Sequence, residues 1–406
     1  MHTFASVVAG HENMLKALFE LPRTVWLLGL VSLFNDATSD LIYPLVPLFL
    51  ASVLMAGPRA LGLIEGVAEA TASLLKLFPG VLVDRTGHAK NWVVGGYGLA
   101  VLARPLFALA TSWPAVLALR FADRVGKGLR TSPRDALLAA TVDGRHRGLA
   151  FGLHRAMDNA GAVIGPLLAA WLLARGVPLR DVFLWAIVPG VITLALALAI
   201  REPPALAVAQ RQPFSWRLAG FPVVYKRYLL VLALFTLGNS SNMFLLLRAR
   251  DLGLAEYQVP LLWALVSAVA TVFSTPLSAL SDRLGRVRLI LAGWVIYGLF
   301  YLLLGINGFH ALLLWPLFAG YGLFLAATEG AEKALVADLA PRERLGTAYG
   351  WFNLTAGVML LPASLLFGWL WQGVSVQAAF AFSSACALLA ALLLRFWVMR
   401  APHVSH

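Results

Sequence analysis

The chain alternates long apolar stretches with short polar breaks over almost its whole length. A membrane-spanning helix takes ~20 apolar residues. Stretches of that kind fall at residues 24–50, 60–80, 92–111, 114–135, 148–173, 182–200, 228–247, 258–280, 289–306, 309–333, 346–370 and 376–398. Because a segment inside lipid must satisfy its backbone hydrogen bonds internally, the pattern predicts an all-α membrane protein with twelve transmembrane helices.

The longest polar break, residues 201–227, divides these stretches into two sets of six. It contains four prolines and five basic residues, a composition typical of a connection. Short matches recur on its two sides at a constant offset of 198, with Asp-Arg-Thr-Gly at 84–87 and Asp-Arg-Leu-Gly at 282–285. We therefore expect a six-helix bundle at 1–200, a cytoplasmic linker at 201–227 and a second six-helix bundle at 228–406.

The composition and the placement of charge agree with this prediction. Hydrophobic residues make up 60% of the chain and charged residues 13%, whereas soluble domains are roughly 25% charged. The net charge of +12 could suggest nucleic acid. If the N-terminus is cytoplasmic, however, the predicted inside segments hold 18 Lys and Arg residues and the outside segments five. This positive-inside bias predicts both termini in the cytoplasm and no nucleic-acid partner. We expect the inner (plasma) membrane of a bacterium as the location.

Charges inside the predicted spans gather in the first half of the chain. That half has eight basic and seven acidic in-span residues, against one basic and two acidic in the second. Intramembrane charges are costly and indicate functional sites. The first half is therefore expected to contain the coupling chemistry, and the second a mostly neutral wall.

Two pairs of acids have helical spacing. Asp36 and Asp40 are four residues apart in the first span, so they share one helix face near mid-membrane. A buried carboxylate beside a like charge can load and release a proton. The alternative is an acid neutralised by a basic residue of the fourth span. In the second span Glu69 lies deeper than Glu65, which is expected near the outer end, and Glu69 is the better candidate for proton coupling. The alternative for this pair is a hydrated rim or a structural ion pair.

The fourth span has a ladder of charges on one helix face. From Arg120 to Arg134 it covers ~21 Å of membrane depth, and such a face must line a cavity or pair with neighbouring helices. We expect Arg120, Asp123 and Arg124 to take part in proton coupling, and Arg134 to belong to a cytoplasmic gate. The alternative is a lattice of pairs with Asp36, Asp40 and Asp158 that only holds the bundle together.

The segment Gly-Val-Leu-Val-Asp-Arg-Thr-Gly-His-Ala-Lys at 80–90, with its second copy at 278–288, resembles the cytoplasmic loop pattern of the major facilitator superfamily. That resemblance implies secondary transport and gating roles for Asp84, Arg85, Asp282 and Arg283. Arg120 stands where the family has a fourth-span arginine tied to proton coupling. The run Gly161 to Pro166 is similar to the pattern of family antiporters, although Ala169 and Ala170 replace the usual glycine pair. The resemblance therefore favours drug or solute efflux in exchange for protons.

The second half offers mixed aromatic and amide side chains. Since ligand pockets are mostly apolar with a few polar groups, these suit a small organic solute, which we expect to bind between the halves. The candidate contacts are Tyr43, Arg104, Arg124, Asp158, Asn239, Asn242 and Trp351. The single cysteine and the absence of a metal or nucleotide motif in the sequence predict no cofactor, no metal and no enzymatic activity. A monomer in the lipid bilayer is expected. Uptake of an anionic organic solute, or a membrane receptor that transports nothing, remain alternatives.

Overall fold

The computed structural model describes residues 20–75, 89–143, 146–201, 218–306, 310–341 and 344–399, and all regular secondary structure in these ranges is helical. The first group of α-helices is α2 (Arg23–Ile42), α3 (Leu45–Ser52), α4 (Pro58–Leu75), α6 (Ala89–Ala103), α7 (Trp113–Thr141), α8 (Arg147–Ala174), α9 (Leu179–Val182) and α10 (Ile187–Leu198). The second group is α11 (Val223–Gly238), α12 (Met243–Asp251), α13 (Gln258–Leu284), α14 (Arg286–Gly305), α15 (Leu314–Leu339), α16 (Leu345–Gly373) and α17 (Val376–Leu393). The predicted linker 201–227 includes the start of α11, and its residues 202–217 lie outside the described ranges.

Ten helical segments of the described chain are long and apolar enough to cross a membrane. Two further long helices, α4 and α7, coincide with predicted spans but are not among those ten. Both contain several charged residues, which lower their mean hydropathy. The prediction of an all-helical protein with many membrane spans is confirmed. Helices α4 and α7 hold four of the six candidate coupling residues, Glu69, Arg120, Asp123 and Arg124, while Asp36 and Asp40 lie on α2.

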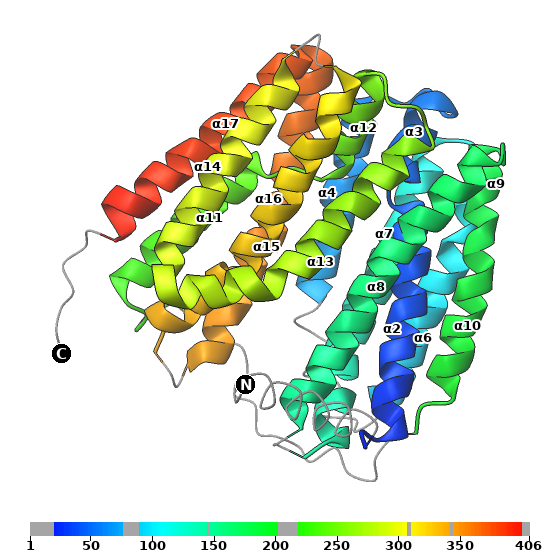
Figure 1. The fold of residues 1–406 in the computed structure, drawn as a ribbon, viewed down its shortest axis with the longest axis horizontal. Helices are drawn as coiled ribbons and strands as arrows, with labels where there is room; N and C mark the ends of the chain where they lie inside the picture. The colour runs from blue at the N-terminus through cyan, green and yellow to red at the C-terminus, as the bar shows by residue number, and fades with distance from the viewer. Residues whose placement is uncertain are drawn as a thin grey trace, which may run out of the picture.

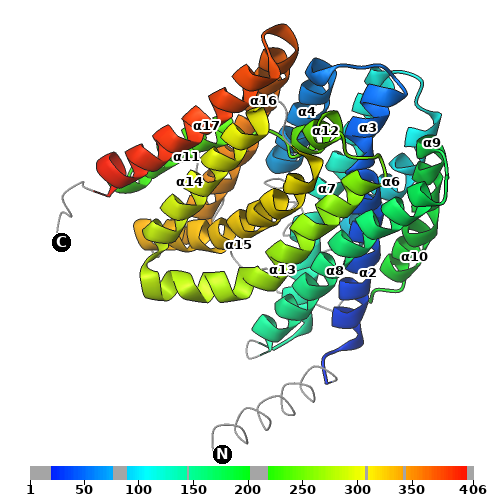
Figure 2. The ribbon, with the colours of Figure 1, turned by 45° about the horizontal axis from the view of Figure 1, so that its top comes forward.

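The two groups of helices occupy two sides of the molecule. Figure 1 shows α2, α6, α7, α8 and α10 together on one side and α11, α14, α15 and α17 on the other. We call the boundary between the two groups the seam. The most extensive packing across it is that of α4 against α16 and of α8 against α13, and the short helix α12 also contacts α3 and α4. Figure 2, a turned view, shows the same separation.

Two helices are broken at equivalent positions. The first break, at Tyr43 and Pro44, separates α2 from α3, because a proline has no N–H to continue the helical hydrogen bonds. The second break, at residues 239–242, separates α11 from α12. There the Asn and Ser side chains offer the backbone competing hydrogen bonds. The short helices after the breaks, α3 and α12, start 198 residues apart and contact each other at one end of the molecule. We call this the α3–α12 end.

Close packing of α8 fixes the position of α2. A Cβ atom added at Gly161 would lie 2.9 Å from the backbone nitrogen of Ala37 and 3.1 Å from the Cβ of Asp36. One added at Gly165 would lie 2.7 Å from the backbone nitrogen of Leu41. Small residues at these two positions let the helix backbones approach. The turns of α2 that contain Asp36 and Asp40 are thereby held against α8.

Candidate coupling and substrate site

Three arginines and three acids form one network of ion pairs, which we call the charged cluster: Glu65 and Glu69 of α4, Arg104 directly after α6, and Arg120, Asp123 and Arg124 of α7. Five of these side chains are at most 4% exposed, while that of Glu69 is 29% exposed. The formal charges cancel. Burial of so many charges is tolerated only when each is paired and hydrogen-bonded.

Helix α7 aligns two of its arginines with two glutamates of α4. Arg120 forms a two-pronged pair with Glu65, with Nε 2.6 Å from Oε1 and Nη2 3.2 Å from Oε2. One turn on, the Nη1 of Arg124 donates to Glu69 across 3.2 Å. Bidentate geometry of this kind is among the strongest polar contacts in proteins.

Asp123 is the centre of the charged cluster. Its carboxylate lies 2.9 Å from the Nε of Arg104, 2.6 Å from the Nη2 of Arg124 and 3.5 Å from the Nη1 of Arg120. Arg104 also donates to the backbone and side-chain oxygens of Asn35, at 2.9 and 3.0 Å. The amide of Asn35 in turn donates to Asp36 across 2.7 Å. A continuous chain of polar contacts therefore leads from the charged cluster to α2.

Asp36 and Asp40 stand apart from the charged cluster. Both are half-buried, and within the described ranges neither forms an ion pair. The Nε1 of Trp263 on α13 donates to Asp40 across 3.3 Å, and the ring of Trp263 lies 5.1 Å from that of Tyr43. Both carboxylates are thus partly accessible acids: Asp40 contacts the second group of helices through Trp263, whereas Asp36 lies beside Asn35 and the Gly161 position of α8.

Asp158 of α8 lies near them. Ser32 of α2 donates to its carboxylate across 2.6 Å, and the Nη1 of Arg155 is 3.6 Å from it. Arg155 also reaches across the seam to Glu329 of α15, at 3.2 Å, and Lys333 holds the same glutamate at 2.9 Å. The predicted substrate residue Asp158 therefore belongs to a polar path between α2, α8 and α15.

The break between α11 and α12 contacts the charged cluster directly. Ser241 donates its hydroxyl proton to Glu65 across 3.0 Å, and its own N–H donates to Ser364 of α16 at 3.3 Å. The neighbouring Asn242 accepts from the hydroxyl of Tyr321 at 2.6 Å. Since Glu65 lies on α4 and Ser241 follows α11, this contact joins the two sides of the seam.

The remaining predicted residues are dispersed. Arg134 pairs with its neighbour Asp135 at 2.9 Å, Trp351 is half-buried in α16, and Asn239 caps the end of α11. Arg283 is exposed in the last turn of α13, which ends at Gly285 with a φ of 92° that favours glycine. Asp84 and Arg85 lie outside the described ranges, and so does the side chain of Asp282.

Comparison with known families decides the class of the protein. Residues 28–247 and 228–406 each match the family model described as Major Facilitator Superfamily. The chain belongs to the major facilitator superfamily. It is a membrane transporter of that superfamily and not an enzyme.

Known relatives of this superfamily member agree with that assignment. An uncharacterized MFS-type transporter of Methanocaldococcus jannaschii is 33% identical over 387 residues, which cover 93% of this chain and 95% of the relative. The multidrug resistance protein MdtH of Photorhabdus laumondii is 34% identical over 133 residues, a third of each chain. The crystal structure of the nucleoside transporter NupG has a TM-score of 0.75 at 14% identity over 94% of this chain and 100% of that one, so the fold is shared.

Glu65 lies in a structural ion pair, one of the two alternatives that the sequence left open for the acids of this helix. Its side chain is 1% exposed, so the other alternative, a hydrated outer rim, is wrong for it. A signal for the pair was present, because Glu65 and Glu69 are four residues apart, as are Arg120 and Arg124. Two helices with matched spacing of opposite charge can pair at both positions. Asp123, in contrast, has no partner in α4. Its charge is neutralised by Arg104 and by the arginines of its own helix, Arg120 and Arg124.

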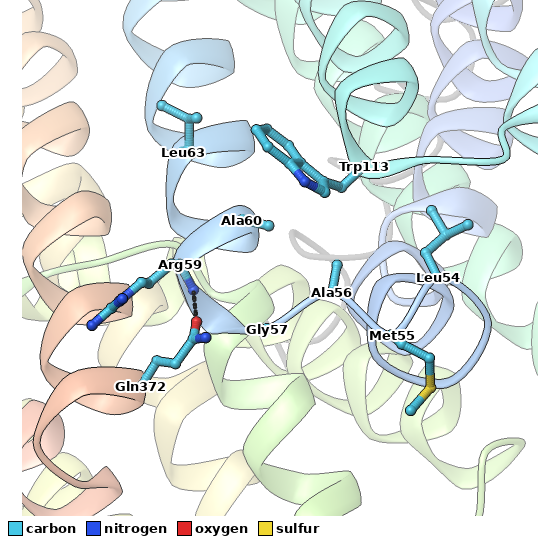
Figure 3. Close-up of a pocket in the computed structure, with 9 residues that line it drawn as sticks. All are labelled: Leu54, Met55, Ala56, Gly57, Arg59, Ala60, Leu63, Trp113 and Gln372. Atoms are coloured by element: carbon cyan, nitrogen blue, oxygen red, sulfur yellow. Dashed lines mark hydrogen bonds between the residues drawn. The ribbon is translucent and has the colours of Figure 1, made fainter.

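A separate cavity of about 400 Å³ opens at the α3–α12 end of the transporter. Figure 3 shows its lining, with Trp113 and Leu63 on one side and Leu54 and Met55 on the other. The backbone N–H of Arg59 donates to the side-chain oxygen of Gln372 across 3.1 Å at its edge, which joins α4 to α16. None of the predicted site residues lines this cavity. Among the described residues, no group of three or more His, Cys, Asp and Glu could hold a metal ion.

Proposed function

We propose that the protein is a proton-coupled secondary transporter that exports a small organic solute across the bacterial inner membrane by alternating access. In this proposal α4 and α7 complete twelve spans, arranged as six-helix halves at 1–200 and 228–406. Both termini face the cytoplasm, so the α3–α12 end faces outside. The solute binds between the halves near mid-membrane.

The accessible carboxylates of Asp36 and Asp40 support proton coupling. The acids of the charged cluster are matched by arginines, whereas these two carboxylates form no ion pair within the described ranges. A carboxylate in such surroundings can be neutralised by a proton from water. Through Asn35, Asp36 also touches the polar chain that leads to Arg104 and Asp123. Loading of a proton can therefore alter the contacts of α2 with the rest of its half.

The burial of the three arginines of the charged cluster disfavours an anionic substrate. Arg104, Arg120 and Arg124 are almost completely buried and paired with acids, so their charge is not offered to a solute. Uptake of an anionic organic solute thus receives less support than export of a neutral or cationic one. The partial likeness to MdtH and the glycine packing of α8 against α2 favour export.

Transport in proteoliposomes tests the proposal. A panel of radiolabelled organic solutes is first screened by counterflow, which needs no coupling. For a solute that is carried, uptake driven by an imposed pH gradient is then compared for the wild type, Asp36→Asn and Asp40→Asn. We expect each substitution to lower gradient-driven accumulation by at least ten-fold and to leave counterflow measurable, because an amide cannot release a proton.

Asp181→Asn, which changes an exposed acid of α9, serves as the matched control and should behave as the wild type. Unchanged gradient-driven flux in both aspartate variants would overturn proton coupling by these residues. Counterflow of no solute in the panel would instead support a receptor that transports nothing.

A further inference from the structure

Two basic residues lie on the face of α11 that is turned away from the other helices. Val223 and Leu230 are 60% and 62% exposed, and their seven-residue spacing places them on one face of the helix. Lys226 and Arg227 lie between them on this face and are half-buried. Because the chain is a membrane transporter, the exposed apolar residues of this face contact lipid. The two cations near the start of the helix therefore reach the lipid headgroups.

Arg227 is held in place by the end of α17. Its Nη1 donates to the backbone oxygen of Trp397 across 3.2 Å, in the π-helical turn η5 (Leu394–Val398). The guanidinium also lies 5.3 Å from the centroid of the Trp397 ring, and Trp397 is 39% exposed. Exposed tryptophans are typical of the membrane–water interface. Figure 1 shows the start of α11 beside the end of α17, at the end of the molecule opposite the α3–α12 end.

The two cations retain free capacity for an anion. A guanidinium has several N–H donors, and the hydrogen bond to Trp397 uses one of them. Among the described residues, no carboxylate forms an ion pair with Lys226 or Arg227. We call this group of three residues, Lys226, Arg227 and Trp397, the basic corner.

The segments that form the basic corner contain no acid to balance its charge. No Asp or Glu occurs between Glu202 and Asp251, and none occurs at 344–406. At the equivalent end of the first group of helices, Glu20 precedes Arg23 of α2 and Glu202 follows Arg201. The positive charge is therefore balanced along the chain in the first group and left unbalanced in the second.

We infer that the basic corner binds the headgroup of an anionic phospholipid. Arg227 pairs with the phosphodiester, since guanidinium and phosphate match in a two-pronged geometry. Lys226 adds a second positive charge, whereas a zwitterionic headgroup brings a cation of its own that both bases repel. The lipid contacts α11 and the end of α17 together. This inference goes beyond the proposed transport function and does not depend on the direction of transport.

Native mass spectrometry of the purified full-length protein in neutral detergent tests the inference with two lipids that have the same acyl chains. Dioleoylphosphatidylglycerol is the anionic probe and dioleoylphosphatidylcholine the zwitterionic one, and the affinity for the first bound lipid is measured for each. We expect the anionic lipid to bind roughly ten-fold more tightly. Lys226→Gln and Arg227→Gln should each weaken its binding about five-fold, the effect of one basic group at an anionic surface. Binding of the zwitterionic lipid should not change.

Two further variants separate the charge from its surroundings. Arg227→Lys keeps the charge but loses the planar fork, so it should weaken binding less than Arg227→Gln does. Arg23→Gln removes an exposed cation at the equivalent end of the first group and should bind the anionic lipid as the wild type does. Melting temperatures confirm that each variant is folded, and the anionic lipid should raise that of the wild type more than that of Arg227→Gln.

Three outcomes would overturn the inference. The first is equal affinity of the wild type for the two lipids. The second is an equal loss in Arg23→Gln and Arg227→Gln, because the attraction then belongs to the basic surface as a whole. The third is displacement of the anionic lipid by millimolar inorganic phosphate, which would make free phosphate the occupant. Since the assay measures binding without transport, none of these outcomes bears on the proposed function, and a protein that carries no solute can still bind lipid here.

Discussion

The charged cluster and the aromatic cluster occupy comparable places on the two sides of the seam, but they are built from opposite chemistry. The charged cluster lies beside the break between α2 and α3. The aromatic cluster, beside the break between α11 and α12, consists of Phe235, Trp294, Tyr297, Phe300, Tyr301, Tyr321 and Phe324. In the latter, Phe235 stacks on Trp294 at 4.4 Å and Tyr297 on Tyr301 at 4.3 Å. A repeated helical arrangement therefore leaves the side-chain chemistry of each half free to diverge.

The difference determines how each side tolerates change. Aromatic packing depends on volume and contact area, so a similar hydrophobic residue can replace one ring. A buried ion-pair network depends on every partner, because loss of one leaves an uncompensated charge in a low dielectric. The side with the charged cluster should thus be the more sensitive to single substitutions of similar size.

The largest effect is expected for Arg120→Met. This change keeps much of the side-chain volume but leaves Glu65 buried beside an apolar group, with the hydroxyl of Ser241 as its remaining described donor. Removing one partner of a buried pair costs about 3–5 kcal/mol. We expect a clear fall in melting temperature, measured for the purified protein in detergent, and reduced yield of monodisperse protein.

Two controls make this a test of the comparison. Phe324→Leu in the aromatic cluster should cost less than about 1.5 kcal/mol. Arg155→Met removes an arginine whose side chain is 59% exposed, and such ion pairs contribute about 0–1 kcal/mol. If Arg120→Met is as stable as either control, the charged cluster is not the sensitive region.

The sequence was informative about helices and about which residues share a face, and much less so about partners. Spacing along the chain placed Asp36 with Asp40 and Arg120 with Arg124, because an α-helix repeats every 3.6 residues. The partners of these groups are 55 residues away in α4, as for Glu65 and Arg120, or across the seam, as for Asp40 and Trp263. Such contacts depend on how helices are rotated and offset against one another, which hydrophobic periodicity does not specify.

The break at residues 239–242 illustrates the same limit. The run of Asn and Ser residues was visible as a polar segment and was assigned to substrate contact. The chain alone did not indicate that it interrupts the helix, or that its hydroxyl reaches Glu65. The equivalent break at Tyr43 and Pro44 has a proline as a local signal. Only the structure shows that both breaks meet the same cluster of charges.

A second, intermediate effect is expected for Gly161→Ala. The added Cβ would press on the backbone of α2 beside Ala37 and Asp36, and overpacking of this kind costs about 1–3 kcal/mol. The shift of α2 should lower gradient-driven flux along with the melting temperature. The matched control, Gly152→Ala, lies in the same helix with no atom within 4 Å of the added Cβ. It should leave both measurements unchanged, and equal effects of the two substitutions would contradict the role of α8 in positioning Asp36.

The smallest effect is expected for Ser241→Ala, which removes the hydrogen bond that joins the two regions. Glu65 keeps both contacts with Arg120, so the loss should be about 1 kcal/mol. The bond links the two sides of the seam beside the α3–α12 end, so its loss should favour separation of that end, and ~1.4 kcal/mol shifts such an equilibrium ten-fold. Spin labels at Met55 and Val374, which are 82% and 62% exposed on the two sides of that end, report the shift in a Cys386→Ser background. We expect a several-fold larger share of long distances in Ser241→Ala than in the neighbouring Ser240→Ala. An identical distance distribution in the two variants would show that the hydrogen bond from Ser241 to Glu65 does not couple the charged cluster to the second group of helices.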